Sequence, residues 1–129
     1  LVGNRLLINE DDIFAVLSQK YGFELVNLED HPFHEQVNLF SNIEMVVGPH
    51  GSGFSNIVFS NPRTLAIDIQ PNTFPVTCFL VLANIVGVEY IPIVGEGIPA
   101  INGNKKHDNV HIEMEPLEKI IQNHLKRSK

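Results

Sequence analysis

The sequence contains few of the residues that mark secreted, membrane-spanning or nucleic-acid-binding proteins. Its only cysteine is Cys78, so an internal disulfide is excluded, and such cysteine usage is typical of a reducing compartment. No apolar run reaches the length of about eighteen residues that crosses a bilayer. No Asn-x-Ser/Thr sequon is present either, so nothing in the sequence indicates a secretory route. We therefore expect a cytoplasmic protein.

Basic residues are also scarce. Nine Lys and Arg residues stand against fifteen Asp and Glu residues, which gives a net charge of −6 at pH 7. This balance argues against nucleic acid or an anionic membrane as the main partner. The chain starts at Leu1 rather than Met, and we expect it to be part of a longer protein. With 129 residues, 43% of them hydrophobic, it is large enough for one domain with a real core.

Short apolar segments alternate with helical patterns along the whole chain. Strands are predicted over residues 6–8, 23–28, 43–48, 64–69 and 88–94, and helices over 10–21, 33–42, 52–59, 73–86 and 116–127. Residues 95–110 are polar and rich in Gly, Asn and Lys, which predicts a loop. The alternation is typical of an α/β, Rossmann-like three-layer domain with a mostly parallel sheet of about five strands.

The carboxyl ends of such strands are where we look for function, because ligands bind beyond that edge of a parallel sheet. Five predicted loops should share this rim: residues 9–11, 29–34, 48–53, 69–73 and 94–97. The run from Met45 to Asn56 is the most informative of them, since an apolar strand ends at a Gly/His/Ser turn that can start a helix. Glycine allows close approach of a ligand, and a helix start offers N–H groups to phosphate.

Three side chains near this rim are candidates for chemistry. His50 can donate to a phosphate or act as a base, or it can simply hold the turn. Glu10 can serve as a general base or sugar ligand, or as an acid that stabilises a helix N-terminus. Arg5 suits bidentate contact with a diphosphate, or it can be a solvated residue near the chain end.

Two other kinds of site are less well supported. Residues 51–56 partly match a dinucleotide fingerprint, with Asn56 in place of its third glycine and Asp68 placed to bind a ribose. Two strand–helix units precede this turn, however, whereas the fingerprint usually follows the first strand. His31 with His34, and His107 with His111, have no accompanying cysteine pair, so a zinc site is not favoured.

The order of several spaced elements resembles glycosyltransferase family 61. The matching elements are Arg5-x-x-Ile8-Asn9-Glu10, Phe33-x-Glu35-Gln36-Val37-x-x-Phe40, Val47-Gly48-Pro49-His50-Gly51-Ser52-Gly53-x-x-Asn56-x-x-Phe59 and Leu82-Ala83-x-x-x-Gly87-x-x-Tyr90. The resemblance covers residues 5 to about 94. Ser52 stands where alanine is common in the family, and a second arginine often found a few residues before Arg5 is absent.

The resemblance implies the C-terminal, donor-binding half of a GT-B glycosyltransferase that transfers a sugar from a nucleotide sugar with inversion. Residues 1–129 would be a single nucleotide-sugar-binding domain of a longer two-domain enzyme, inactive without its N-terminal domain. A UDP-sugar would be the donor and a saccharide or protein hydroxyl the acceptor, in capsular or cell-surface polysaccharide synthesis. No metal or other cofactor would be required.

The resemblance also assigns roles to residues. His50 and Glu10 become candidate catalytic residues, and the donor would be bound by Arg5, Gly51, Ser52, Gly53 and Asn56. We expect Gly53→Val to block donor binding and to leave the fold largely intact. The apolar helix over residues 76–85 could bury itself against a second copy. A dinucleotide-binding oxidoreductase domain and a non-catalytic binding module remain the alternatives.

Overall fold

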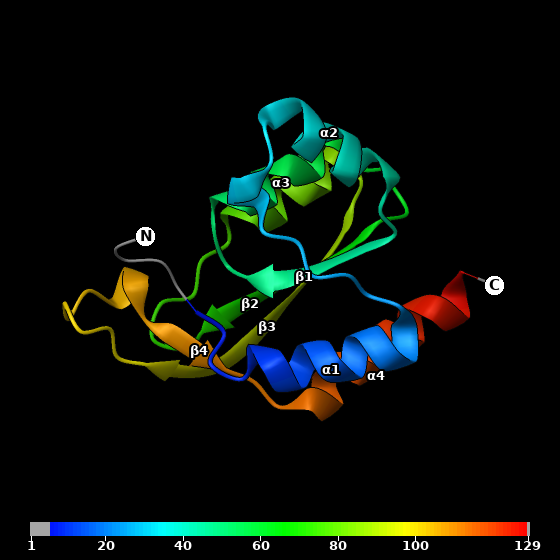
Figure 1. Ribbon diagram of the computed structural model, residues 1–129. Coiled ribbons are helices and arrows are strands. Elements are labelled where there is room, and N and C mark those ends of the chain that lie inside the picture. The colour runs from blue at the N-terminus through cyan, green and yellow to red at the C-terminus, as the bar shows by residue number, and fades with distance from the viewer. Residues whose placement is uncertain (1–5, 129) are drawn as a thin grey trace.

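The computed structural model describes residues 6–128, so Arg5 lies outside the described residues. Figure 1 shows an α/β domain in which a sheet is flanked by helices on both faces. The helices are α1 (Glu10–Tyr21), α2 (Phe33–Asn42), α3 (Cys78–Val86) and α4 (Met114–Arg127). The strands are β1 (Met45–Pro49), β2 (Leu65–Pro71), β3 (Glu89–Ile98) and β4 (Asn109–His111). Three 3₁₀ segments complete the fold: η1 (Leu28–Asp30), η2 (Ser52–Phe59) and η3 (Lys105–His107).

The sheet has the strand order β1-β2-β3-β4. The β1–β2 and β2–β3 pairs are parallel, as predicted, and β4 pairs antiparallel with the end of β3. The register places Pro49 opposite Ile69 and Pro71 opposite Gly95, so the loops that follow the three parallel strands lie at one end of the sheet. Figure 1 shows this end on the left.

The prediction of about five strands is wrong for the described residues, which form four. Residues 23–28 were expected to be a strand, but they form a connection from α1 to η1 in which Leu25 is 62% exposed. A strand needs a hydrogen-bonding neighbour. Among the described residues β1 pairs with β2 alone, so residues 23–28 do not join the sheet. The predicted strand over residues 6–8 is reduced to a single bridge between Leu7 and Val110.

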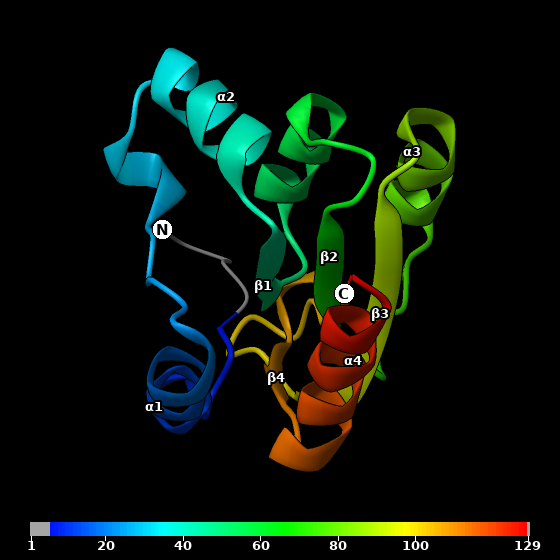
Figure 2. The same cartoon turned by 90° about the vertical axis from the view of Figure 1, so that its right-hand side faces the viewer.

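Strand β2 is the centre of the core, because all of its seven residues are buried. Leu65, Ile67 and Ile69 face the layer of α1 and α4, where they pack with a cluster that includes Leu17 and Ile121. Ala66 faces the opposite layer of α2, η2 and α3. Figure 2 shows the two helical layers above and below the strands. Successive strand residues point to opposite faces, so Asp68 and Gln70 belong to the Ala66 face.

The predicted helix before Gly87 begins later than the sequence indicated. It was expected to be capped by Asn72 or Thr73, but α3 begins at Cys78. The reason lies in Gln70, whose side-chain amide donates to the Val76 carbonyl at 2.8 Å and accepts from the Val76 N–H at 2.9 Å. These two bonds hold the chain in an extended form just before the helix. Gly87 ends the helix in the left-handed region (φ 81°), as predicted.

Residues 95–110 are more ordered than the predicted loop. β3 continues to Ile98, and the chain returns as β4 beside it. Asp108 holds this excursion, because it accepts hydrogen bonds from Thr73 Oγ1 at 2.7 Å and from the Ala100 N–H at 3.0 Å. No helix among residues 6–128 is long and apolar enough to cross a membrane.

Candidate functional site

His50 lies immediately after β1 and extends its pairing with β2, since its N–H donates to the Ile69 carbonyl at 2.8 Å. Its ring nitrogen Nδ1 is 2.8 Å from Oδ2 of Asp68. The side chain of Asp68 is fully buried, and that of His50 is 10% exposed. The carboxyl end of the parallel sheet therefore carries a buried carboxylate in contact with an imidazole.

Two further donors reach the same carboxylate. The hydroxyl of Tyr90 donates to Oδ2 of Asp68, and Nε2 of Gln70 lies 3.1 Å from that oxygen. Nε2 of Gln70 is also 3.2 Å from the Tyr90 hydroxyl. The other oxygen of Asp68, Oδ1, is buried without a hydrogen-bond partner among the described residues.

Apolar rings cover this polar group. The ring of Phe79 on α3 lies 5.0 Å from the His50 ring and 5.9 Å from that of Phe54 on η2. Burial raises the pKa of Tyr90 well above its usual range, and the hydrogen bond to Asp68 raises it further. Tyr90 therefore stays protonated across the physiological range and acts as a donor to Asp68.

None of the glycines of the turn is needed for its backbone conformation, because Gly48, Gly51 and Gly53 all lack a positive φ. Gly51 is extended, and an added Cβ would meet nothing closer than the Pro49 carbonyl at 3.9 Å. At Gly53 an added Cβ would lie 2.7 Å from Cδ1 of Leu28. A substitution at Gly53 therefore requires the end of the Leu28 side chain on η1 to move, and the expectation that Gly53→Val leaves the fold largely intact stays a prediction.

Asn56 and Ser52 are placed very differently within η2. Asn56 is only 7% exposed, and its amide donates to Oε1 of Gln36 at 2.9 Å. Its contacts are thus with the protein interior. Ser52 is exposed at the start of η2, where its carbonyl accepts a hydrogen bond from Ser55 Oγ at 2.7 Å.

Glu10 is exposed as the first residue of α1. The residue before it, Asn9, anchors this helix start to the end of β4, because its amide donates to the Ile112 carbonyl at 2.8 Å. The structure thus places Glu10 on the N-terminal helix, beside β4, while the contacts of His50 come from β2 and α3. His31, which was considered as a metal ligand, is paired with Glu35 at 2.9 Å.

Comparison with known proteins shows the family to which this chain belongs. A family model described as "Glycosyltransferase 61" matches residues 2–67, just over half of the chain. This chain belongs to the glycosyltransferase 61 family. The match includes His50 and the whole turn to η2, so the resemblance seen in the sequence is confirmed.

Individual relatives match a larger part of this chain than the family model does. The chain is 27% identical over 129 residues to protein O-linked-mannose beta-1,4-N-acetylglucosaminyltransferase 2 of Xenopus laevis, over 91% of this chain and 22% of that protein. It is 32% identical over 88 residues to the EGF domain-specific O-linked N-acetylglucosamine transferase of Drosophila melanogaster, over 67% of this chain and 17% of that protein. The chain thus spans about a fifth of the length of these relatives.

In this glycosyltransferase 61 chain, two residues of the site, Asp68 and Gln70, were not predicted as site residues from the sequence. Asp68 was weighed only as a ribose ligand, and Gln70 was not singled out. The signal was present, because both interrupt an apolar, fully buried strand and are two residues apart, which places them on one face. Their burial against His50 and Tyr90 argues against contact of Asp68 with a ribose.

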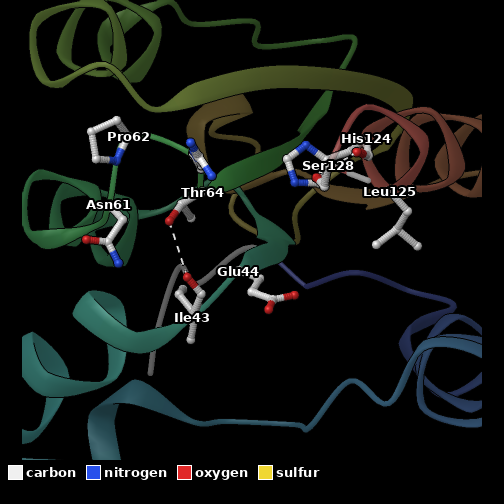
Figure 3. Close-up of a pocket in the computed structure, with 9 residues that line it drawn as sticks. Ile43, Glu44, Asn61, Pro62, Thr64, His124, Leu125 and Ser128 are labelled. Carbon is white, nitrogen blue, oxygen red and sulfur yellow. Dashed lines mark hydrogen bonds between the residues drawn. The ribbon is translucent and has the colours of Figure 1, made fainter.

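A cavity of about 510 Å³ lies at the opposite end of the sheet. Figure 3 shows it beside the start of β2, where Oγ1 of Thr64 donates to the Ile43 carbonyl at 3.2 Å. Its lining also comes from the end of α4, at His124, Leu125 and Ser128. The cavity contains none of the predicted site residues, so its volume does not mark the site.

Proposed function

We propose that this chain is the donor-binding part of a glycosyltransferase that moves a sugar from a nucleotide sugar to an acceptor hydroxyl with inversion. Membership of the glycosyltransferase 61 family supports the reaction class. The observation that carries the assignment to particular residues is the contact between His50 and the buried Asp68 at the carboxyl end of the parallel sheet. Ligands of open α/β sheets bind at this edge.

The turn from Gly51 to Gly53 would hold the diphosphate of the donor. The first backbone hydrogen bond of η2 runs from the Phe54 N–H to the Gly51 carbonyl at 3.1 Å. The N–H groups of Ser52 and Gly53 precede it, as the first donors of any helix do. Such groups and nearby cations stabilise the negative charge of a leaving diphosphate, so the reaction would need no metal. Arg5, outside the described residues, would add a cation.

His50 would be the base. Its Nδ1 faces the Asp68 carboxylate, so in the neutral imidazole Nδ1 carries the proton and Nε2 is the acceptor. As the acceptor oxygen bonds to the anomeric carbon and the bond from that carbon to the diphosphate breaks, Nε2 would take the hydroxyl proton. Glu10 is the alternative base, exposed at the start of α1.

The names of the relatives favour a particular donor and acceptor. They refer to transfer of N-acetylglucosamine to O-linked mannose or to EGF domains. We therefore propose a UDP-sugar as donor and a protein-linked hydroxyl as acceptor, in place of the capsular polysaccharide that the resemblance suggested. The N-terminal domain, the cytoplasmic location and self-association through α3 stay predictions.

Calorimetry with the full-length protein tests this function. We expect binding of UDP, GDP or CDP sugars and no binding of NAD. NAD binding without nucleotide-sugar binding would overturn the proposal in favour of the oxidoreductase alternative. A protein that binds a donor but neither transfers nor hydrolyses its sugar would be a binding module instead.

A further inference from the structure

Three side chains donate to a single oxygen of Asp68. The imidazole of His50, the hydroxyl of Tyr90 and the amide of Gln70 all reach Oδ2, from the end of β1, from β3 and from β2 itself. A buried carboxylate is costly unless it is hydrogen-bonded, and a sheet can be packed without one. The neighbour Ala66 on the same face shows that this layer accepts an apolar residue.

Tyr90 and Gln70 do not need Asp68 in order to satisfy their own polar groups. The amide of Gln70 is bonded through both of its polar atoms to the backbone of Val76, and its Nε2 also reaches the Tyr90 hydroxyl at 3.2 Å. His50 is the residue for which the carboxylate has a distinct consequence, because only an imidazole changes its proton content near neutral pH.

We infer that Tyr90 and Gln70 are positioning residues, which act on His50 by orienting and partly neutralising the Asp68 carboxylate between them. This inference rests on the proposed function for its meaning in the reaction, but the linkage itself can be measured without any substrate. Asp68, Gln70 and Tyr90 lie outside residues 2–67, which the family model matches.

The linkage has a definite sign. Each hydrogen bond that Oδ2 accepts from a neutral donor spreads the charge of Asp68 and weakens the hydrogen bond that the carboxylate accepts from Nδ1 of His50. Removing the Tyr90 hydroxyl should therefore strengthen the hydrogen bond from His50, while removing the charge of Asp68 should weaken it.

Nitrogen-resolved NMR of the imidazoles in the full-length protein tests the inference. The signal of His50 is assigned by its loss in His50→Gln. We expect Nδ1 to carry the proton in the neutral form. We further expect the proton on Nδ1 of His50 to resonate further downfield in Tyr90→Phe than in the wild type, and further upfield in Asp68→Asn.

The chain offers a matched control, because its other tyrosine, Tyr21, bonds Glu118 on α4, away from this site. Tyr21→Phe should leave the chemical shift of that proton unchanged. An equal chemical shift in wild type and Tyr90→Phe would overturn the inference. If the variants fail to fold, a wild-type His50 whose neutral form carries its proton on Nε2 would overturn it as well.

UDP titrations of the same variants separate this inference from the proposed function. A proton resonance of His50 that moves as expected, in a protein that binds no nucleotide diphosphate, would sustain the linkage and count against the donor site. Nucleotide binding with an unmoved resonance would do the reverse.

Discussion

The side-chain amide of Asn56 donates to the side-chain oxygen of Gln36 at 2.9 Å and so joins η2 to α2. Gln36 in turn donates through Nε2 to the carbonyls of Leu28 and His31, at 2.8 and 2.9 Å. One buried amide pair thus fixes η1, α2 and η2 relative to one another. These two residues stand in the Glu-Gln and His-Gly elements by which the family was recognised, and the structure shows why they occur together.

Asn56→Ala is expected to destabilise the protein by about 1–3 kcal/mol, because it leaves the partly buried Oε1 of Gln36 without its donor. Urea denaturation measures the loss. Asn123→Ala, at an exposed position of α4, should change stability by less than about 0.5 kcal/mol. A large loss of UDP affinity at unchanged stability would instead indicate that Asn56 contacts the donor, as the sequence predicted.

Gly53→Ala should cost about 1 kcal/mol, since the added methyl overlaps Cδ1 of Leu28 and the end of that side chain must move. Gly51→Ala, in an extended and open position, should change stability by less than about 1 kcal/mol. A double-mutant cycle with Leu28→Ala checks the mechanism, because removing Cδ1 of Leu28 makes room at Gly53. Additive effects of the two substitutions would show that the contact is not the cause.

His50→Gln should lower kcat by about 10²- to 10⁴-fold if His50 is the base. Glu10→Gln, at an exposed helix start, should lower it by less than about 10-fold. Both are assayed with the nucleotide sugar that the full-length protein binds and a protein-linked acceptor. The opposite ranking of the two variants would identify Glu10 as the base and leave His50 as a residue that shapes the turn.

The anchored excursion after β3 predicts a dependence on acid. The hydrogen bond from Thr73, followed by that from the Ala100 N–H and by the charge of Lys105, lowers the pKa of Asp108 below its ordinary value of 3.8. A lowered pKa in the folded state contributes stability above the ordinary value, and this is lost as pH falls through the folded value. Thermal unfolding between pH 6 and pH 2 should therefore show a loss that Asp108→Asn flattens.

Two comparisons test this acid dependence. Thr73→Val should raise the pKa of Asp108 and so reduce the acid-dependent loss, because it removes the first of the hydrogen bonds that lower it. Asp30→Asn, at an exposed position of η1, should leave the profile unchanged. A profile of Asp108→Asn that parallels the wild type would show that another carboxylate is responsible.

Much of the fold follows from local patterns in the sequence. The helices over α1, α2 and α4, the short helix after the glycine turn and the three parallel strands all lie where periodicity and the Gly22 and Gly87 caps predicted them. Residues 23–28 show the limit of this reasoning. Their apolar content predicts a strand, but a strand also requires a neighbour, and no local pattern states which edges of a sheet are paired.

Only a part of the site could be predicted, for a similar reason. His50 was found because it stands in a conspicuous turn. Its contact with Asp68 spans 18 positions along the chain, and the contact of Asp68 with Tyr90 spans 22. Both exist only because the parallel register brings three strands together. Gly53 shows the same limit of local patterns, since its neighbour Leu28 precedes it by 25 positions and belongs to a different element.

The alternation of β2 between two faces has a consequence for how mutations will sort. A saturation screen that records both abundance and activity should show a period of two along this strand. Substitutions at Leu65, Ile67 and Ile69 should reduce activity only as far as they reduce abundance. Substitutions at Asp68 and Gln70 should reduce activity further than abundance, so that a single strand carries two phenotypes on adjacent residues.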